Sequence, residues 1–443
     1  MPSSPNSAFV HWPDAPLTER LVRDALNDLG VAYLDAPTGS GKLLQWSTYD
    51  SLDHERALLD PKNILSSSYT FRKALIRKHF LSRVTHAYTT KHPDSVLKVA
   101  IPETYELELT FADELDEMWL DDLYELGDKL EAGDAWWILK PGMADRGMGI
   151  RLFNSKNQLQ RIFEGFESDD DGEDEGNAGA SNTAVVISQL RHFVVQEYLP
   201  TPLLFDPHEN ASNGKNKEDP FSGHKFHLRV YCVASGALQV YVYTRILALF
   251  APVPYATPEV GEDELEVSLK PHLTNTCLQA ELGGEHVRLF DELIGRRILS
   301  GSFGKFTEGD LNSIVNQVSD VLADTFRAAV DSPVHFQARL DLRSLPLPNA
   351  FELYGVDFLV SDTGSTNLSE RFQVHLLEIN AEPAIEMTGP RLTWVLEDLF
   401  KSIAQTCVKP FFPIEPEQQQ DWPAGEVRSR LKKCLDMETR NWD

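Results

Sequence analysis

Residues 136–153, WWILKPGMADRGMGIRLF, constrain the fold of this chain more than any other segment. Two short apolar runs enclose a loop with three glycines, a pattern that predicts a β-hairpin. Glycine lets backbone N–H groups approach a ligand closely, and Lys140 at the end of the first run adds a positive charge. Taken alone, the segment fits a phosphate-binding flap and an ordinary surface hairpin equally well. The glycines of the loop are Gly142, Gly147 and Gly149.

The composition is that of a globular protein without membrane spans. At 443 residues, with 42% hydrophobic and 25% charged residues, the chain can form two or three domains with substantial cores. No apolar run reaches membrane-spanning length, and the N-terminus has no basic segment followed by an apolar core. The four cysteines are far apart in sequence, which indicates reduced thiols and argues against a zinc site. We therefore expect a cytoplasmic protein with no membrane partner.

The net charge of −27 disfavours direct binding to nucleic acid, but the charge is unevenly distributed. Residues 113–134 hold ten carboxylates and one lysine, and residues 164–175 hold eight carboxylates and no base. Residues 71–92 hold six arginines and lysines and no acid. This basic segment could be a solvated helix face, or it could receive an anionic partner and place a lysine on a phosphate.

Strands and helices are mixed without strict alternation, which favours α+β domains over a doubly wound sheet. A solvated, disordered acidic insertion is expected at 167–182 and a polar linker at 207–221. The expected strands are 31–34, 192–199, 225–233, 237–250, 351–360 and 371–379, and the expected helices are 17–29, 69–92, 111–131, 285–298, 310–329 and 392–406.

Residues 36–42, APTGSGK, resemble a phosphate-binding P-loop. That motif needs a Ser or Thr hydroxyl for Mg²⁺ at the next position, where this chain has Leu43. No apolar strand ending in an acidic metal ligand follows at the usual distance. We interpret the segment as a turn.

Polar and charged side chains inside apolar strands, two of them late in the chain, point to a metal and phosphate site. Asp357, Glu378 and Asn380 offer two carboxylates and an amide oxygen, and positions 378 and 380 of an extended strand share one face. Such oxygen ligands suit Mg²⁺. Charges in apolar strands are costly unless they are paired, so a purely solvent-facing role fits them less well. Lys225, Arg229 and Arg245 offer positive charge to a polyanion from similar strands.

Eight blocks of the sequence, taken as a set, resemble the tubulin–tyrosine ligase family and look closest to its fungal branch. In chain order the blocks are RKALIRKHFL (72–81), WWILKPGMADRGMGI (136–150), VVQEYL (194–199), KFHLRVY (225–231), YVYTRILALF (241–250), HLTNTCLQ (272–279), GVDFLV (355–360) and LLEINAEPA (376–384).

The resemblance implies an ATP-grasp fold in which a central and a C-terminal α+β domain clasp ATP and Mg²⁺. It implies a small N-terminal domain at 1–69, a central domain at 70–200, a C-terminal domain at 201–410 and a polar tail at 411–443. By the family's motifs, Lys78 and Lys140 would contact phosphates beneath the glycine loop of Gly147 and Gly149, and Lys225 would lie beside the adenine. The residues implied to line the adenine pocket are Gln196, Glu197, Tyr198 and Leu199.

The same resemblance implies the reacting groups. Arg229 and Arg245 would hold the γ-phosphate and the acyl-phosphate that forms from it. Thr274 and Asn275 would lie near the ribose and the reacting end of the nucleotide. The implied Mg²⁺ ligands are Asp357, Glu378 and Asn380.

One position departs from the family pattern. Many members read Lys-Phe-Asp-Leu-Arg where this chain has His227 in place of the aspartate. An imidazole can still hydrogen-bond a nucleotide hydroxyl, but it lacks the negative charge, so nucleotide affinity or acceptor chemistry can differ.

The expected activity is ATP-dependent ligation of tyrosine to the C-terminal tail of α-tubulin, with free amino acid as the second substrate. Two alternatives remain open. The first is the same chemistry on another protein acceptor or with another amino acid, because the nucleotide motifs do not define the amino-acid pocket. The second is an ATP-binding scaffold with little ligase activity in a messenger-ribonucleoprotein (P-body) complex.

Overall fold

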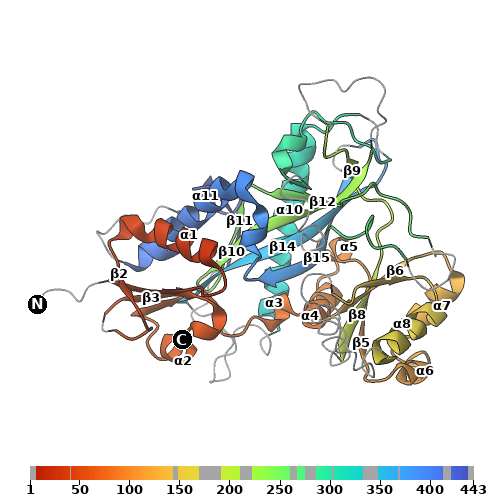
Figure 1. Cartoon of the computed structure of the whole chain (residues 1–443), viewed down its shortest axis with the longest axis horizontal. Coiled ribbons are helices and arrows are strands. Elements are labelled where there is room, and N and C mark those ends of the chain that lie inside the picture. The colour runs from red at the N-terminus through yellow and green to blue at the C-terminus, as the bar shows by residue number, and fades with distance from the viewer. Residues whose placement is uncertain are drawn as a thin grey trace, which may run out of the picture.

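The computed structural model describes residues 6–39, 41–142, 148–168, 191–209, 222–259, 267–274, 286–301, 304–332, 348–367, 370–412 and 421–437. Their strands form two four-stranded sheets and one nine-stranded sheet, which lies between the other two in Figure 1. The expected insertion at 167–182 and linker at 207–221 fall mostly outside these residues. Within the described residues, no helix is both long and apolar enough to cross a bilayer.

The N-terminal sheet is parallel, in the order β2-β1-β3-β4. Helix α1 connects β1 to β2 and packs against helix α11 of the chain's C-terminal part. The P-loop look-alike lies between β2 and β3, where Lys42 Nζ donates a hydrogen bond to the Lys62 carbonyl at 2.7 Å. The elements are β1 (Ser7–His11), α1 (Pro16–Leu26), β2 (Ala32–Leu34), β3 (Leu43–Ser47), α2 (His54–Leu59) and β4 (Ile64–Ser66).

The basic segment 71–92 forms two helices instead of the single helix expected. Helix α3 (Lys73–Ile76) ends at Arg77, whose extended backbone (φ −104°, ψ 118°) separates it from α4 (Lys78–Lys91). The short helix α5 (Leu97–Ala100) follows. The interruption lets Arg72 and Lys78 contact two different points of the large sheet, as described below.

The second four-stranded sheet is antiparallel, in the order β5-β8-β6-β7, and contains the predicted glycine hairpin. Trp137 of β6 pairs with Phe153 of β7. The helix expected at 111–131 is broken around Asp121 and Asp122, because aspartate favours turns over helix interiors. The elements are β5 (Thr104–Glu108), α6 (Leu115–Met118), α7 (Tyr124–Ala132), β6 (Trp137–Pro141), β7 (Arg151–Phe153), α8 (Lys156–Ser168) and β8 (His192–Glu197).

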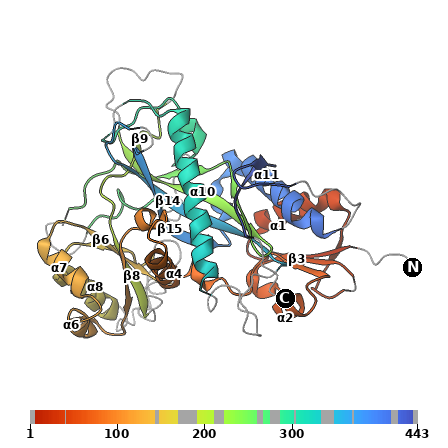
Figure 2. The ribbon, with the colours of Figure 1, turned by 180° about the vertical axis from the view of Figure 1, so that it is seen from behind.

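The large sheet is built around β10, which pairs antiparallel with β14, β11 and β12. Alternate residues of β10 pack into two cores: Val230 on the side of α10, and Tyr231 on the side of α1 and α11. Figure 2 shows α10 lying across one face of this sheet. The elements are β9 (Leu204–Phe205), β10 (His224–Ser235), β11 (Gln239–Tyr243), β12 (Leu247–Phe250), β13 (Val287–Leu289), α10 (Glu308–Val330), β14 (Phe351–Asp362), β15 (Phe372–Ala381), α11 (Thr393–Ile403), β16 (Val427–Arg428) and β17 (Leu431–Asp436).

Three expectations for this part of the chain differ from the structure. The strand expected at 237–250 is two strands, β11 and β12. The helix expected at 285–298 is strand β13 followed by one 3₁₀ turn (Phe290–Leu293). The expected polar tail contains β16 and β17, and β17 pairs with β11 and buries Leu431 and Leu435. Two leucines four residues apart, with two lysines between them, are too weak a pattern to predict a sheet strand.

Candidate nucleotide site

One pocket lies between the β5–β8 sheet and the large sheet, and residues of both sheets line it. It encloses about 700 Å³ of empty space including its open mouth. Its lining residues are Ile138, Lys140, Ile150, Gln196, Glu197, Tyr198, Leu199, Lys225, His227, His272, Leu273, Thr274, Asp357, Leu359, Leu377 and Glu378.

Two buried lysines give the pocket positive charge. Lys140, at the end of β6, donates a hydrogen bond to Gln196 Oε1 at 2.6 Å. Lys225 of β10 donates to the Tyr198 hydroxyl at 3.3 Å and lies over the Tyr198 ring. Burial lowers the pKa of Lys140 to about 8. Burial, reinforced by the neighbouring Lys140, lowers the pKa of Lys225 to about 7. Neither lysine has a carboxylate partner among the described residues, so a bound polyanion would satisfy both.

The chain leaving β8 forms the apolar part of the pocket. Tyr198 packs with Ile138, Ile150 and Leu273 in one buried cluster. The Tyr198 hydroxyl lies 2.9 Å from His272 Nδ1, which fixes the tyrosine ring. An apolar surface of this kind, beside hydrogen-bonding backbone, suits an aromatic base.

The predicted carboxylates meet on adjacent strands. Asp357 of β14 is the register partner of Glu378 of β15. The next pair joins positions 358 and 376, so Leu377 is the extra residue of a β-bulge. A bulge redirects neighbouring side chains, and here Leu377 joins Asp357 and Glu378 in the pocket lining.

Each carboxylate is paired with a cation that was also predicted for the site. Arg229 donates two hydrogen bonds to Asp357, at 2.5 and 3.0 Å. Lys78, the first residue of α4, lies 3.1 Å from Glu378 Oε2, and Asn380 Nδ2 donates to Glu378 Oε1 at 3.1 Å.

The surroundings favour the ionised forms of Glu378 and Arg229. Burial opposes the charge on Glu378, but Lys78, Asn380 and Lys140 together hold its pKa well below the usual range. Burial likewise opposes the charge on Arg229, yet Asp357 raises its pKa above the ordinary value. Lys78 and Arg229 therefore balance the two carboxylates, and Lys140 and Lys225 remain as further cations of the site.

The donor set fits Mg²⁺ by chemical type: two carboxylates and one amide lie together on the adjacent strands β14 and β15. Within the described residues, no group of three or more His, Cys, Asp or Glu side chains is arranged to hold a metal ion. The set here has only two such residues, Asp357 and Glu378, so phosphate oxygens and water would have to complete the coordination.

His227, the departure from the family pattern, is buried between Thr274 and Asp357. Its Nδ1 lies within hydrogen-bonding distance of Thr274 Oγ1, and its Nε2 lies 3.6 Å from Asp357 Oδ1. Burial lowers the pKa of His227. A neutral imidazole therefore occupies the place of the family's aspartate.

Arg245 is not part of the pocket lining. Its Nε donates to Asp398 of α11 at 3.2 Å, and its guanidinium lies 4.5 Å from the ring centre of the half-exposed Trp394. Two other predicted residues, Gly147 and Asn275, lie outside the described residues. Gly149 is described and has a φ of +70°, a conformation that favours glycine.

Sequence reasoning did not single out several lining residues. His272 belongs to the same block as Thr274, and its bond to Tyr198 could not be inferred without the fold. Strand alternation could have found two others, because Leu359 lies two residues after Asp357 and Ile138 lies two residues before Lys140.

Comparison with known proteins identifies the family of this chain. The model of the tubulin–tyrosine ligase family matches residues 59–416. The chain is 36% identical to the probable tubulin–tyrosine ligase PBY1 of Saccharomyces cerevisiae, over 90% of this chain and 50% of the relative. It is also 36% identical to a probable tubulin–tyrosine ligase of Schizosaccharomyces pombe, over 93% of this chain and 94% of the relative. The chain thus spans about half the length of the first relative and nearly all of the second.

A solved structure shares the fold. The crystal structure of the C-terminal domain of Pby1 from K. lactis, described as an ATP-grasp enzyme interacting with the mRNA decapping enzyme Dcp2, superposes with a TM-score of 0.64 at 29% identity. The match covers 98% of this chain and 100% of that domain. The fold is therefore α+β of the ATP-grasp type, and the chain belongs to the tubulin–tyrosine ligase family.

Proposed function

We propose that this protein is an ATP-dependent ligase that joins a free amino acid to a protein carboxylate. The observation that carries the proposal is the pairing of Lys78 with Glu378 and of Arg229 with Asp357 beside the buried lysines of one pocket. These two ion pairs can be exchanged when ligands bind, so that the cations take phosphates and the carboxylates take a metal ion.

In this proposal the pocket binds ATP by its apolar and its charged halves. The base lies against Tyr198 and Leu273, and Lys140, Lys225 and Lys78 hold the phosphates. Bound Mg²⁺, held by Asp357, Glu378 and Asn380, would neutralise phosphate charge. We further propose that Gly147, Gly149, Thr274 and Asn275 complete the nucleotide site as the family motifs imply.

The reaction needs no covalent enzyme nucleophile. A carboxylate oxygen of the acceptor attacks the γ-phosphorus and ADP leaves; the amine of the amino acid then attacks the acyl carbon, loses a proton, and phosphate leaves. The protein's part is to position the reactants and stabilise negative charge, which Arg229 would do from the pocket edge. Arg245 would do the same from the turn between β11 and β12, where it pairs with Asp398 of α11.

We propose tyrosine as the amino acid and the α-tubulin C-terminal tail as the acceptor, in the cytoplasm. The family and both fungal relatives carry that name. More distant relatives are named tubulin polyglutamylases and a tubulin glycylase, so the alternative amino acids are glutamate and glycine.

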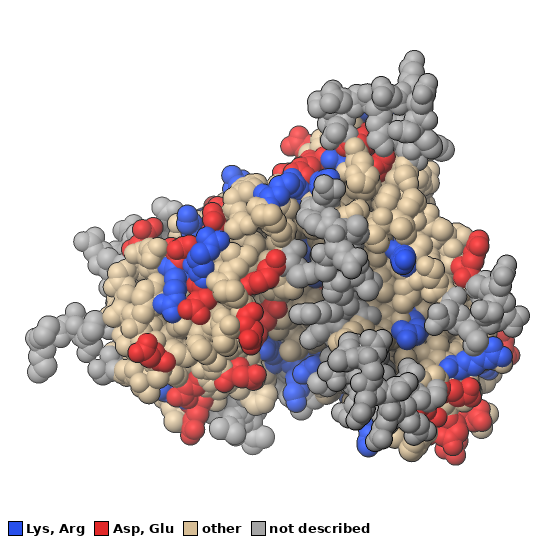
Figure 3. Space-filling model, viewed as in Figure 1, with Lys and Arg blue, Asp and Glu red and all other residues tan. Residues whose placement is uncertain are grey.

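The basic segment supports an acidic acceptor. Among the described residues, Lys73, Arg77 and Lys91 have no carboxylate partner, whereas Arg72, Lys78 and Arg83 do. Basic side chains show at the lower centre of the face in Figure 3, where α3 and α4 lie in Figure 1. Added salt should weaken acceptor binding. Salt-independent binding would show that the basic segment does not attract the acceptor.

A second candidate is an ATP-binding scaffold with little ligase activity in an mRNA-decapping complex. The observation that favours it is the relative from K. lactis, whose description names an interaction with the decapping enzyme Dcp2. In this candidate the same pocket binds ATP, and a decapping protein replaces tubulin as the partner.

The test is incorporation of labelled tyrosine into detyrosinated tubulin with ATP and Mg²⁺, beside a Glu378→Gln variant. Incorporation by the wild type that the variant lacks supports the proposal. Incorporation that the variant retains removes the magnesium assignment. ATP binding without incorporation of tyrosine, glutamate or glycine favours the scaffold.

A further inference from the structure

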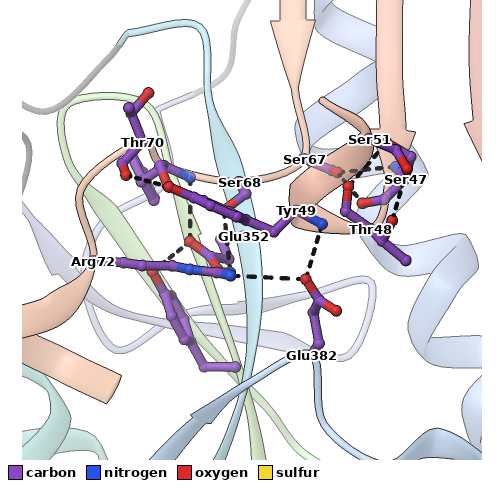
Figure 4. A network of polar contacts seen from close by, with 12 residues as sticks. Ser47, Thr48, Tyr49, Ser51, Ser67, Ser68, Thr70, Arg72, Glu352 and Glu382 are labelled. Atoms are coloured by element: carbon purple, nitrogen blue, oxygen red, sulfur yellow. Dashed lines mark hydrogen bonds and ion pairs between the residues drawn. The ribbon is translucent and has the colours of Figure 1, made fainter. Parts of the chain in front are cut away.

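Arg72 lies at the centre of a polar cluster outside the pocket. Its guanidinium pairs with Glu352 of β14, lies 3.7 Å from Glu382 Oε1, and covers the Tyr49 ring at 4.1 Å from the ring centre. Figure 4 shows these side chains converging from the turn that follows β3, from β14 and from the end of β15. Neither Arg72 nor its partners line the nucleotide pocket.

The Glu352 side of the cluster is fixed. Glu352 is 2% exposed and accepts hydrogen bonds from the Tyr69 backbone at 3.2 Å and from the Tyr354 hydroxyl at 2.7 Å. A buried carboxylate with three donors has little freedom to move, because each lost bond would leave a buried charge unsatisfied. Arg72 is thereby anchored to β14.

On its other side, the cluster contacts Glu382 at the end of β15. Glu382 follows the last residue of β15 and lies two positions after Asn380 and four after Glu378. Its φ of +52° is unusual for a non-glycine residue and persists where surrounding contacts enforce it. Those contacts are Arg72 and the Tyr49 backbone N–H, which donates to Glu382 Oε1 at 3.0 Å.

A second observation connects this turn to the pocket. Gly355 of β14 pairs with Asn380, and a Cβ atom there would lie 2.7 Å from Pro383 Cβ and 3.3 Å from Arg229 Cδ. The chain after β15 therefore folds back onto β14 directly beside the arginine that holds Asp357. A shift of Glu382 would displace Pro383 and disturb both metal-binding strands.

Two ion pairs thus join the basic segment to β15: Lys78–Glu378 at the pocket and Arg72–Glu382 outside it. On the proposed function, the first must open when ATP and metal bind. The Arg72–Glu382 pair lies outside the pocket, so no ligand competes for it and it can stay intact.

We propose that Arg72, with Glu352, Glu382 and Tyr49, is a positioning clamp that holds Glu378 and Asn380 in place for Mg²⁺ while the Lys78–Glu378 pair exchanges. The inference rests on the proposed nucleotide site but not on tubulin or tyrosine. Through Tyr49, the N-terminal part of the chain then contributes to metal binding.

The test uses Glu382→Gln, with Glu386→Gln as the matched control. Both glutamates are exposed, follow β15 and contact the N-terminal part of the chain; Glu386 accepts from the Thr18 hydroxyl at 3.2 Å. ATP affinity is measured by calorimetry with Mg²⁺ and with EDTA, and the ratio of the two affinities is the readout. Thermal melting verifies that each variant is folded.

Glu382→Gln is expected to lower the Mg²⁺-dependent gain about tenfold, the lower end of the effect of outer-shell partners on metal affinity. Its affinity in EDTA should match the wild type, and Glu386→Gln should leave both affinities unchanged. Arg72→Lys, which keeps the charge but loses the planar fork, should fall between wild type and Glu382→Gln.

An unchanged ratio in Glu382→Gln, equal losses with Mg²⁺ and EDTA, or the same loss in Glu386→Gln would each overturn the clamp. A wild type with no Mg²⁺-dependent gain would overturn the magnesium assignment and the clamp together. Failure of tubulin tyrosination with the gain intact would affect only the proposed acceptor and amino acid.

Discussion

The Lys78–Glu378 pair and the Arg72–Glu352–Glu382 cluster connect the same basic segment to the same sheet, yet their surroundings differ. Glu378 lines the pocket, and the Lys78 and Glu378 side chains are 15% and 24% exposed. Arg72 and Glu352 are 12% and 3% exposed and lie away from the pocket. An ion pair between these segments can therefore exchange its partners where a ligand has access to it. Where a ligand has no access, the same kind of pair holds the two segments together.

The two ion pairs should differ most in how much their loss lowers the free energy of unfolding. Arg72→Met should lower the free energy of unfolding by about 3–5 kcal/mol, because Glu352 is left as an uncompensated buried charge. Lys78→Met should cost less, about 1.5–3 kcal/mol, because Glu378 is partly exposed and keeps its hydrogen bond from Asn380. Urea denaturation measures both.

The control for that experiment is the double variant Arg72→Met/Glu352→Gln, which removes the orphaned charge and should recover much of the loss. Similar costs for Arg72→Met and Lys78→Met would show that the two ion pairs do not differ as described.

Glu378→Gln tests the exchanging side of the comparison. It should slow ligation by about 10²–10³-fold, the usual effect of removing one charge-stabilising group from an active site. Its free energy of unfolding should change little, since Glu378 is not an isolated buried charge. Normal turnover with ADP release in this variant would contradict the assignment.

The sequence predicted the composition of the site better than its arrangement. Lys140, Gln196–Leu199, Lys225, Thr274, Asp357 and Glu378 line one pocket although they come from six separate segments. Local patterns and family motifs sufficed there, because each residue belongs to a strand or strand end with a distinctive block. The family and the ATP-grasp fold were also predicted correctly.

Long-range pairing could not be predicted. Arg245 lies between two strands, and its partner is Asp398 of helix α11, which belongs to no motif. The bulge at Leu377 depends on the register between β14 and β15, and β17 joins the sheet only through β11. The break at Arg77 likewise follows from tertiary contacts of Arg72 and Lys78, since the helical pattern of the segment is continuous.

The two buried lysines predict a pH dependence of nucleotide binding. They bind phosphates only when protonated, and burial lowers their pKa to about 7 for Lys225 and about 8 for Lys140 in the free protein. Bound phosphates raise both pKa values, so binding takes up protons above pH 7, and affinity falls as pH rises from 7 to 9.

The expected fall is up to about tenfold per pH unit for each lysine that has lost its proton. Calorimetry in buffers of different ionisation enthalpy measures the proton uptake. In Lys225→Met the uptake near pH 7.5 should be reduced. A pH-independent affinity with no proton uptake would mean that the lysines do not contact the phosphates.

The smallest expected effect concerns Arg245, whose pair with Asp398 is partly exposed at 24% and 37%. Asp398→Asn should change the free energy of unfolding by less than about 1 kcal/mol. If Arg245 holds the reacting phosphate, the variant should alter kcat more than ATP affinity. An unaltered kcat would indicate that Arg245 takes no part in the reaction.

A crystal structure with Mg²⁺ and a non-hydrolysable ATP analogue tests the central claim most directly. The account predicts that Lys78 leaves Glu378 for a phosphate and that Glu378 and Asn380 contact the metal ion. Arg72 should stay on Glu352 and Glu382. Nucleotide bound with the Lys78–Glu378 pair intact, or with the Arg72 cluster opened, would contradict it.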